Sequence, residues 1–381
     1  MEHIAINKRP LLSWIPKVED FYGDVLVVPV LYENPQSAGI ASLSTAVANA
    51  QTTKQVKFQI SARKKAYGAV QIEAEAMMAA AKDVGAFIRA KDTQIRGMLR
   101  QMGKQAHLSL YRDGSGTLGV VSSVSSNTIT LTRKADVYNF GEGQVLQADT
   151  GGNKTARTGT MTVVKVNHAA GTIEVDSLVS GTTTSDHLYT QGNIDAVITG
   201  LEGWIPLTAP GSSDSFFGVN RSVNVAALSG HRVNDTSRSI LTNAEELAML
   251  IGEFGGEPDA LFLNPRAGLQ LSQEVGAKVE RTDGGRADVL FNGFTLHNFV
   301  TGPISVIFDP GCPQDRGYML QRNTWKVHHL GGFPHLISDD GRDSLRSADG
   351  SYDGIEVRAR YFAELACDAP GYNGVMAVAV E

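Results

Sequence analysis

Residues 73–116 are EAEAMMAAAKDVGAFIRAKDTQIRGMLRQMGKQAHLSLYRDGSG, and this stretch decides the fold. Its apolar side chains recur three and four residues apart, at Val84, Phe87, Ile88, Ile95, Met98, Leu99, Met102 and Ala106. That spacing predicts one helix over about 73–111 with a single apolar stripe. At 1.5 Å per residue the helix would be roughly 50 Å long, more than the width of a small domain. We therefore expect a spine helix that other elements cross and that ends at Asp113-Gly114-Ser115-Gly116.

The chain before this helix has no obvious core of its own. Residues 1–22 are predicted to be an extended arm, and its Trp14 must dock on another part of the molecule or on another subunit. Strands are predicted at Asp24–Leu31 and Lys57–Ile60, with a small, polar segment between them. Because a two-stranded hairpin is marginal in water unless something packs on it, we expect a subunit that folds partly onto its neighbours.

The same excursion is basic, with no acidic residue between Asn34 and Ile72. One interpretation is a solvated face, and another is nucleic-acid binding, although few aromatic residues are present for base stacking. The interpretation that we favour is charge complementarity with an acidic patch of a neighbour in the 339–356 region. The candidate contact residues between subunits are Trp14, Lys54, Lys57, Arg63, Lys64, Lys65, Asp339, Asp340 and Glu356.

Residues 115–192 are predicted to be an inserted β-barrel or β-sandwich domain with an internal repeat. The run Gly119–Val124 followed by Thr128–Leu131 resembles Thr162–Val166 followed by Thr172–Val175. Each half reads as a strand, a short turn and a second strand, bounded by segments rich in Gly, Ser and Thr.

The remainder is a mixture of helices and strands, so the predicted fold class is α+β. Thr242 is predicted to cap a helix, with Glu245 completing a capping box, and Asn264-Pro265 opens another helix. A hairpin is predicted at 291–294. Strands are expected at 260–263, 304–308, 318–322, 325–330, 354–362 and 375–380.

Composition describes a globular protein. The 381 residues are 42% hydrophobic and 19% charged, with a net charge of −6 that argues against nucleic-acid binding over the whole surface. Cys312 and Cys367 are expected to be reduced and packed, since two cysteines make neither a disulfide framework nor a zinc quartet. Neither a leader peptide nor a membrane span is expected, which indicates synthesis in a reducing cytoplasm.

The motifs that resemble chemical sites do not fit them. Gly114-Ser115-Gly116-Thr117-Leu118-Gly119 has the dinucleotide spacing, but a helix precedes it and a strand follows. His328 and His329 would point to opposite faces of a strand, and the aspartates of 339–353 lack the order of a calcium loop. No hydrolase, metalloprotease or P-loop motif is present. We predict no catalytic residue, no cofactor and no metal site.

The order of parts resembles that of the major capsid proteins of tailed bacteriophages, which have the HK97-type fold. The resemblance covers nearly the whole chain except the β insert. It rests on the order and on these segments: Phe217–Ser222, the helix Leu241–Phe254, the strand Leu261–Leu263, Asn264-Pro265, the strands around Trp325, Glu356–Phe362, and Pro370 with the final strand.

The resemblance implies a division into eight parts. These are an N-terminal arm (1–22), an extended loop (23–68), the spine helix of a peripheral domain (69–114), the β insert (115–192), further peripheral segments (193–235 and 320–362), an axial domain (236–319) and a return to it (363–381).

It also implies a structural protein rather than an enzyme. The subunit would form hexamers and pentamers of an icosahedral shell around double-stranded DNA bound without sequence recognition. Expected partners are a separate scaffolding protein, a portal and a decoration protein, with no membrane. The shell would assemble in the host bacterial cytoplasm and become the virion capsid. A covalent cross-link through Lys54, Lys57 or Lys64 is a minor possibility.

Three other functions stay open. An encapsulin shares the fold but would need a groove for cargo peptides and usually lacks a β insert. A module that binds carbohydrate or a cell surface through the β insert would leave the arm and the spine helix unexplained. An enzyme is disfavoured because the motifs are missing.

Overall fold

The computed structural model describes residues 9–34, 42–61, 63–75, 84–275, 295–296, 302–338, 345–346 and 353–379. The chain divides into two compact units. Unit 1 comprises Met1–Phe21, Arg63–Gly200 and Val327–Leu365, and unit 2 comprises Tyr22–Ala62, Leu201–Lys326 and Ala366–Glu381. Residues 201–235 and 320–326 lie in unit 2 together with residues 236–319.

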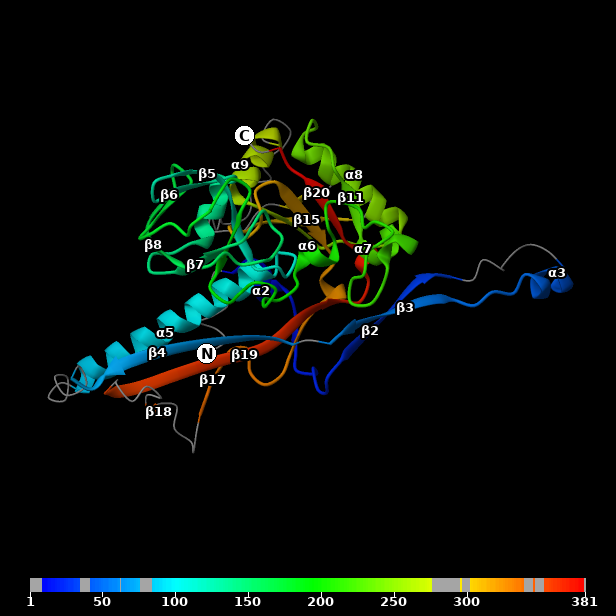
Figure 1. The fold of residues 1–381 in the computed structure, drawn as a ribbon. Coiled ribbons are helices and arrows are strands. Elements are labelled where there is room, and N and C mark those ends of the chain that lie inside the picture. Colours follow the sequence, from blue (N-terminus) through cyan, green and yellow to red (C-terminus); the bar gives the residue numbers. More distant parts are fainter. Residues whose placement is uncertain are drawn as a thin grey trace, which may run out of the picture. The chain divides into compact units, whose positions relative to one another are not determined.

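Unit 1 is built on a long strand and a long helix, β19 (Gly354–Cys367) and α5 (Val84–Ser109) (Figure 1). Strand β4 (Lys64–Glu73) runs antiparallel to β19. Met98 and Met102 of α5 approach the backbone of β4 at Gly68 so closely that a Cβ there would lie 2.7 Å from the Met102 Sδ atom. The remaining strands of this sheet are β1 (Lys17–Val18), β16 (Trp325–His329), β17 (His335–Leu336) and β18 (Leu345–Arg346).

The helix predicted over about 73–111 is present as α5, and β4 ends at Glu73, where that helix was predicted to begin. Strand β4 itself was not predicted. Its side chains alternate between half-buried and exposed, and its backbone pairs with β19. One prediction for the N-terminal third is wrong. The arm is not extended throughout, because Pro10–Trp14 form helix α2, where Leu11 and Leu12 are fully buried.

The predicted β insert is a closed barrel. Its strands follow the order β10-β5-β6-β9-β8-β7 around the barrel. They are β5 (Thr117–Ser125), β6 (Thr128–Leu131), β7 (Val145–Ala148), β8 (Met161–Asn167), β9 (Thr172–Val175) and β10 (His187–Thr190), with a 3-10 helix η1 at Lys134–Asn139. Apolar side chains that alternate along each strand fill the interior, and closure leaves no unpaired sheet edge.

The internal repeat predicted from the sequence is present in the barrel's register. In the β5–β6 pair the register shifts between Val121 and Ser123, and in the β8–β9 pair it shifts between Val163 and Lys165. The third strands also correspond, since β7 and β10 pair with each other. The barrel therefore consists of two three-stranded halves with the same pattern of strand pairing.

The chain enters and leaves the barrel side by side. The Asp195 amide donates to the Ser115 carbonyl at 2.9 Å. Gly116 has a φ of +89°, and a Cβ there would lie 2.3 Å from the Asn193 carbonyl oxygen, so only glycine fits. The glycine motif at 114–119 is thus a linker, as predicted.

Unit 2 contains a mixed six-stranded sheet in the order β11-β20-β15-β12-β14-β13. Helix α8 (Ile240–Glu253) contacts β11, β20 and β15, and helix α9 (Pro265–Val275) follows β12. The strands are β11 (His231–Val233), β12 (Ala260–Leu263), β13 (Thr295–Leu296), β14 (Ile304–Phe308), β15 (Arg316–Leu320) and β20 (Gly374–Ala377). Short helices are α6 (Leu201–Trp204), η2 (Arg221–Val223), α7 (Val225–Ser229), η3 (Arg322–Thr324) and η4 (Pro370–Tyr372).

The predicted capping box of α8 is wrong. Ser239 is the N-cap, and its hydroxyl accepts the amide of Thr242 at 3.2 Å, so the cap lies three residues before the predicted one. The cap of α9 is as predicted, with Asn264 accepting the amide of Arg266. The predicted hairpin at 291–294 lies outside the described residues.

Asn373 joins three segments of unit 2. Its amide oxygen accepts from the Trp325 indole N–H and the Gln321 amide, each at 2.8 Å. Its NH₂ donates to the Thr324 hydroxyl and the Ala369 carbonyl, each at 2.9 Å. The side chain is fully buried, and all of its hydrogen-bonding capacity is used.

We predict that Asn373→Asp lowers the free energy of unfolding of the isolated subunit by about 3 kcal/mol, because two donors are lost and a charge is buried. Urea denaturation measures this loss. The control is Asn49→Asp, since Asn49 is exposed at the end of a surface helix. Equal stability of the two variants would contradict the role given to Asn373.

Candidate assembly interface

The basic excursion is a hairpin whose base is anchored in unit 2. Strands β2 (Leu26–Glu33) and β3 (Lys54–Ile60) pair antiparallel (Figure 1). Phe58 is fully buried, and its ring centroid lies 5.1 Å from Trp204 and 6.2 Å from Phe216. The Gln59 amide donates to the Phe217 carbonyl at 2.9 Å. Edge-on aromatic contacts and a backbone hydrogen bond thus fix the hairpin's base.

The anchor depends on a buried arginine. Arg221 lies over the Phe216 ring, 4.1 Å from its centroid, and pairs with both carboxylate oxygens of Asp214. It also donates to the carbonyls of Gly203 and Trp204. The ion pair holds the pKa of Asp214 below its usual value. This segment includes the turn at Phe217–Ser222 that carried part of the family resemblance.

One face of the hairpin is covered and the other is not. Val28 and Val30 of β2 are buried with Phe58 and Ile60 of β3. The alternate residues of β2 point the other way, and they are apolar but exposed: Val27, Pro29 and Leu31. Leu31 is 66% exposed. Cross-strand neighbours on this face are polar, Gln59 opposite Val27, Lys57 opposite Pro29 and Gln55 opposite Leu31.

The helix beyond β2 adds to this uncovered surface. Helix α3 (Leu43–Ala48) has no buried residue, and Leu43 is 81% exposed. Leu43 and Val47 are four residues apart and so lie on one face of the helix. Ser42 caps α3 with its hydroxyl. A capped helix and a strand that both expose apolar side chains indicate a surface that another molecule covers.

The predicted cationic residues fall into two groups. Lys57 and Lys65 are exposed, and Lys54 pairs with Glu33 of the same hairpin at 2.7 Å. Arg63 donates to the Phe21 carbonyl and lies over its ring, and Lys64 donates to the Asp195 carbonyl at 2.7 Å. Arg63 and Lys64 therefore make stabilising contacts within unit 1.

The other predicted contact residues are placed differently. Trp14 is half-buried at the end of α2 within unit 1. Glu356 is buried and pairs with Arg358 of the same strand at 2.7 Å, so its charge is already balanced within the subunit. Asp339 and Asp340 lie outside the described residues.

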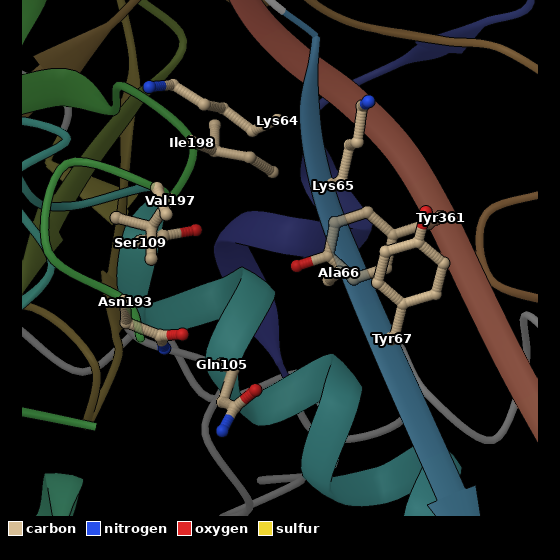
Figure 2. Close-up of a pocket in the computed structure, with 11 residues that line it drawn as sticks. Lys64, Lys65, Ala66, Tyr67, Gln105, Ser109, Asn193, Val197, Ile198 and Tyr361 are labelled. Atoms are coloured by element: carbon tan, nitrogen blue, oxygen red, sulfur yellow. The ribbon is translucent and has the colours of Figure 1, made fainter. Parts of the chain in front are cut away.

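A pocket of about 230 Å³ lies in unit 1 beside β4 and the end of α5 (Figure 2). Gln105 and Ser109 line it from α5, and Asn193 from the chain leaving the barrel. The Ser109 hydroxyl donates to the Ala106 carbonyl, and the described lining contains no His, Cys, Asp or Glu. Lys64 also lines the pocket and donates to the Asp195 carbonyl at 2.7 Å.

Glu364 is a fully buried carboxyl in the same unit. One oxygen accepts the Thr199 amide at 2.6 Å, while the other has no hydrogen-bond partner among the described residues. Burial raises the pKa of Glu364 from 4.5 to about 8, although the Thr199 amide and the charge of Lys64 act in the opposite direction. This carboxyl is therefore largely protonated at neutral pH.

Within the described part of the chain, no three His, Cys, Asp or Glu side chains are placed to hold a metal ion. Among those same residues no helix combines the length and hydropathy of a membrane span. Cys312 and Cys367 are both buried as free thiols.

Sequence reasoning missed the stripe on β2 and the anchor at Phe216 and Arg221. Its β-branched residues identified the strand, but they are apolar on both faces, so the exposed face carried no signal of its own. The anchor depends on contacts between distant segments.

A scan against protein-family models gave no match, and a search of curated proteins by sequence gave none. Among solved structures, the capsid protein of cyanophage A-1(L) is similar at a TM-score of 0.53 and 13% identity, over 98% of this chain and 93% of that chain. The SrpI encapsulin of Synechococcus elongatus matches at a TM-score of 0.48 and 9% identity, over 98% and 88%. The capsid of a native GTA particle matches at 0.47 and 10%, over 97% and 90%. The cyanophage likeness shows the fold and confirms the fold class predicted from the order of parts.

We predict that Glu364→Gln weakens the pH dependence of subunit stability. A carboxyl whose pKa rises on folding stabilises most fully below pH 4.5, and this contribution disappears as the pH rises through about 8. The variant cannot ionise, so above pH 8 its free energy of unfolding should exceed that of the wild type by up to about 5 kcal/mol.

Denaturation of the isolated subunit between pH 5 and pH 9 tests this expectation. Glu174→Gln is the control, since Glu174 is exposed on the barrel. Parallel stability curves for the wild type and Glu364→Gln would contradict the assignment of a buried, neutral carboxyl.

Proposed function

Because the chain has the HK97-type major capsid fold, we propose that it is the structural subunit of the icosahedral head shell of a tailed bacteriophage. The shell would self-assemble and enclose packaged double-stranded DNA. The observation that carries the proposal is the hairpin: its base is locked by Phe58 and Arg221, while the apolar face of β2 and all of α3 are left without cover. A second copy of the chain is the cover that a shell provides.

The energetics favour many modest contacts. Full burial of one exposed valine or leucine contributes about 1.5–3 kcal/mol, which is small beside the entropy lost on association. Once a subunit is held at one contact, each further contact is intramolecular and adds at a high effective concentration. The hairpin is one such contact.

We assign the spine helix and the late strands to a peripheral domain, and residues 236–319 with the final strand to an axial domain. The subunit would sit in hexamers and pentamers. A scaffolding protein, a portal and a decoration protein are the proposed partners, and DNA would be held without sequence recognition. Assembly would take place in the host bacterial cytoplasm, and the product would be the virion capsid.

An encapsulin-like shell is the second candidate, since it would need the same uncovered hairpin. The closed barrel, which is inserted through paired linkers, favours the phage assignment because encapsulins usually lack such an insert. A surface-binding module would use the barrel but would leave the hairpin unexplained.

We predict that the expressed chain, alone or with the scaffolding protein encoded beside it, forms closed shells visible by electron microscopy. Shells purified from phage-producing cells should protect double-stranded DNA from nuclease, whereas an encapsulin would enclose a protein cargo instead. A small soluble species under every condition would overturn the shell assignment.

We further predict that the double variant Val27→Ser/Leu31→Ser reduces the yield of shells at least about tenfold, the effect of about 1.4 kcal/mol per contact. The soluble subunit should keep its melting temperature, since both side chains are exposed. Gln59→Ser/Gln55→Ser is the matched control, because these residues lie directly opposite on the same face. A normal yield from the Val27/Leu31 variant, or an equal loss from the control, would contradict the role of the β2 stripe.

A further inference from the structure

The outer face of α8 is an acidic stripe with an apolar centre. Glu245, Met249 and Glu253 are spaced four residues apart and exposed, and Met249 is 51% exposed. The opposite face of α8 is packed in the core of unit 2. Within the described residues, neither Glu245 nor Glu253 forms a salt bridge, although Glu253 interacts electrostatically with His231.

Helix α9 borders a small pocket with the complementary character. The pocket measures about 140 Å³ and is lined by Arg266, Leu269, Gln270, Gln273 and Gln314 among others. Leu269 is 63% exposed, and the Arg266 guanidinium has no carboxylate partner among the described residues. An engineered cavity of about 150 Å³ holds a benzene ring, so this pocket can take one methionine side chain.

The pocket also holds a polar group that needs a partner. Gln314 is only 5% exposed, yet its amide oxygen has no hydrogen-bond partner within the described chain. A buried acceptor left unpaired is unfavourable, and a backbone N–H of a molecule that enters the pocket would pair with it. The lining thus offers an apolar contact, a cation and an amide.

The stripe and the pocket lie on two neighbouring helices of unit 2. Helix α8 contacts β11, β20 and β15 and also α9, whose Glu274 accepts the amides of Ile240 and Leu241 at the start of α8. None of the three stripe residues lines the pocket, so the stripe and the pocket are different surfaces. A contact between two different surfaces of one subunit is heterologous, and such contacts form a ring when the rotation between subunits closes.

We propose that the α8 stripe of one subunit docks on the α9 pocket of the next, with Met249 entering the pocket and the flanking glutamates facing Arg266. The occupant is a second copy of this chain. The proposal rests on the proposed shell function and names the side chains that join adjacent unit 2 sheets around a ring.

Disulfide trapping tests the contact. Cys312 and Cys367 are buried, so new surface cysteines can be oxidised selectively. Met249→Cys combined with Leu269→Cys should give, on oxidation of assembled shells, a covalent ladder that extends beyond dimers. Each single variant should give no covalent product, since its partner position lacks a thiol.

The outcomes separate the two proposals. Shells without a ladder, or dimers from Met249→Cys alone, would overturn this contact and leave the shell function standing. The absence of shells from the wild-type chain would remove both proposals.

A charge exchange gives an independent measurement without cysteines. Arg266→Glu should lower shell yield at least tenfold, and combining it with Glu245→Arg and Glu253→Arg should restore it. Loss without restoration, in a subunit whose melting temperature is unchanged, would count against the pairing of these charges.

Discussion

A hairpin of two strands has two faces and can bury only one of them against its own subunit. In this chain Phe58 and Ile60 place the buried face against the aromatic anchor at Trp204 and Phe216. Everything beyond the anchor follows from that constraint. The stripe on β2 stays in water, α3 packs on nothing in the described chain, and the lysines keep the exposed surface soluble. Because the base of the hairpin is rigid, the orientation of this exposed surface is fixed. A flexible loop would not fix it.

The barrel differs from the hairpin, because it buries its apolar side chains without a partner. Its sheet is closed, its interior is filled, and its two linkers are joined by the hydrogen bond from Asp195 to Ser115. Such a domain can be inserted into a turn without separating the ends that it interrupts. Gly116 marks this junction, since the close approach to Asn193 excludes a side chain.

The sequence pattern predicted the elements whose conformation depends on residues close together in the chain. The repeated strands of the barrel, the strand at Ala260–Leu263 and the cap at Asn264 all follow from alternation, turns or capping within a few residues. Strand β4 was not predicted, because it owes its conformation to β19, almost 300 residues later in the chain. The candidate interface was predicted only as a basic excursion. Arg63 is held by Phe21 and Lys64 by Asp195, so these two cations do not extend freely into solvent. Nothing near Arg63 or Lys64 in the sequence indicates those contacts.

Stability and assembly are assigned to different chemistry in this subunit. Groups that hold the fold are buried and fully paired, as Asn373 and the Arg221–Asp214 pair are, so they do not change when a neighbour arrives. The surfaces proposed for assembly combine exposed apolar side chains with nearby charges. On the hairpin, Leu31 of β2 is exposed beside β3, the strand that carries Lys57. On α8, Met249 is exposed between Glu245 and Glu253. Like charges repel and so oppose non-specific association of the apolar side chains. Opposite charges attract and so favour the orientation in which they are paired. A free subunit can then remain soluble and folded, while correct contacts accumulate only in a closed assembly.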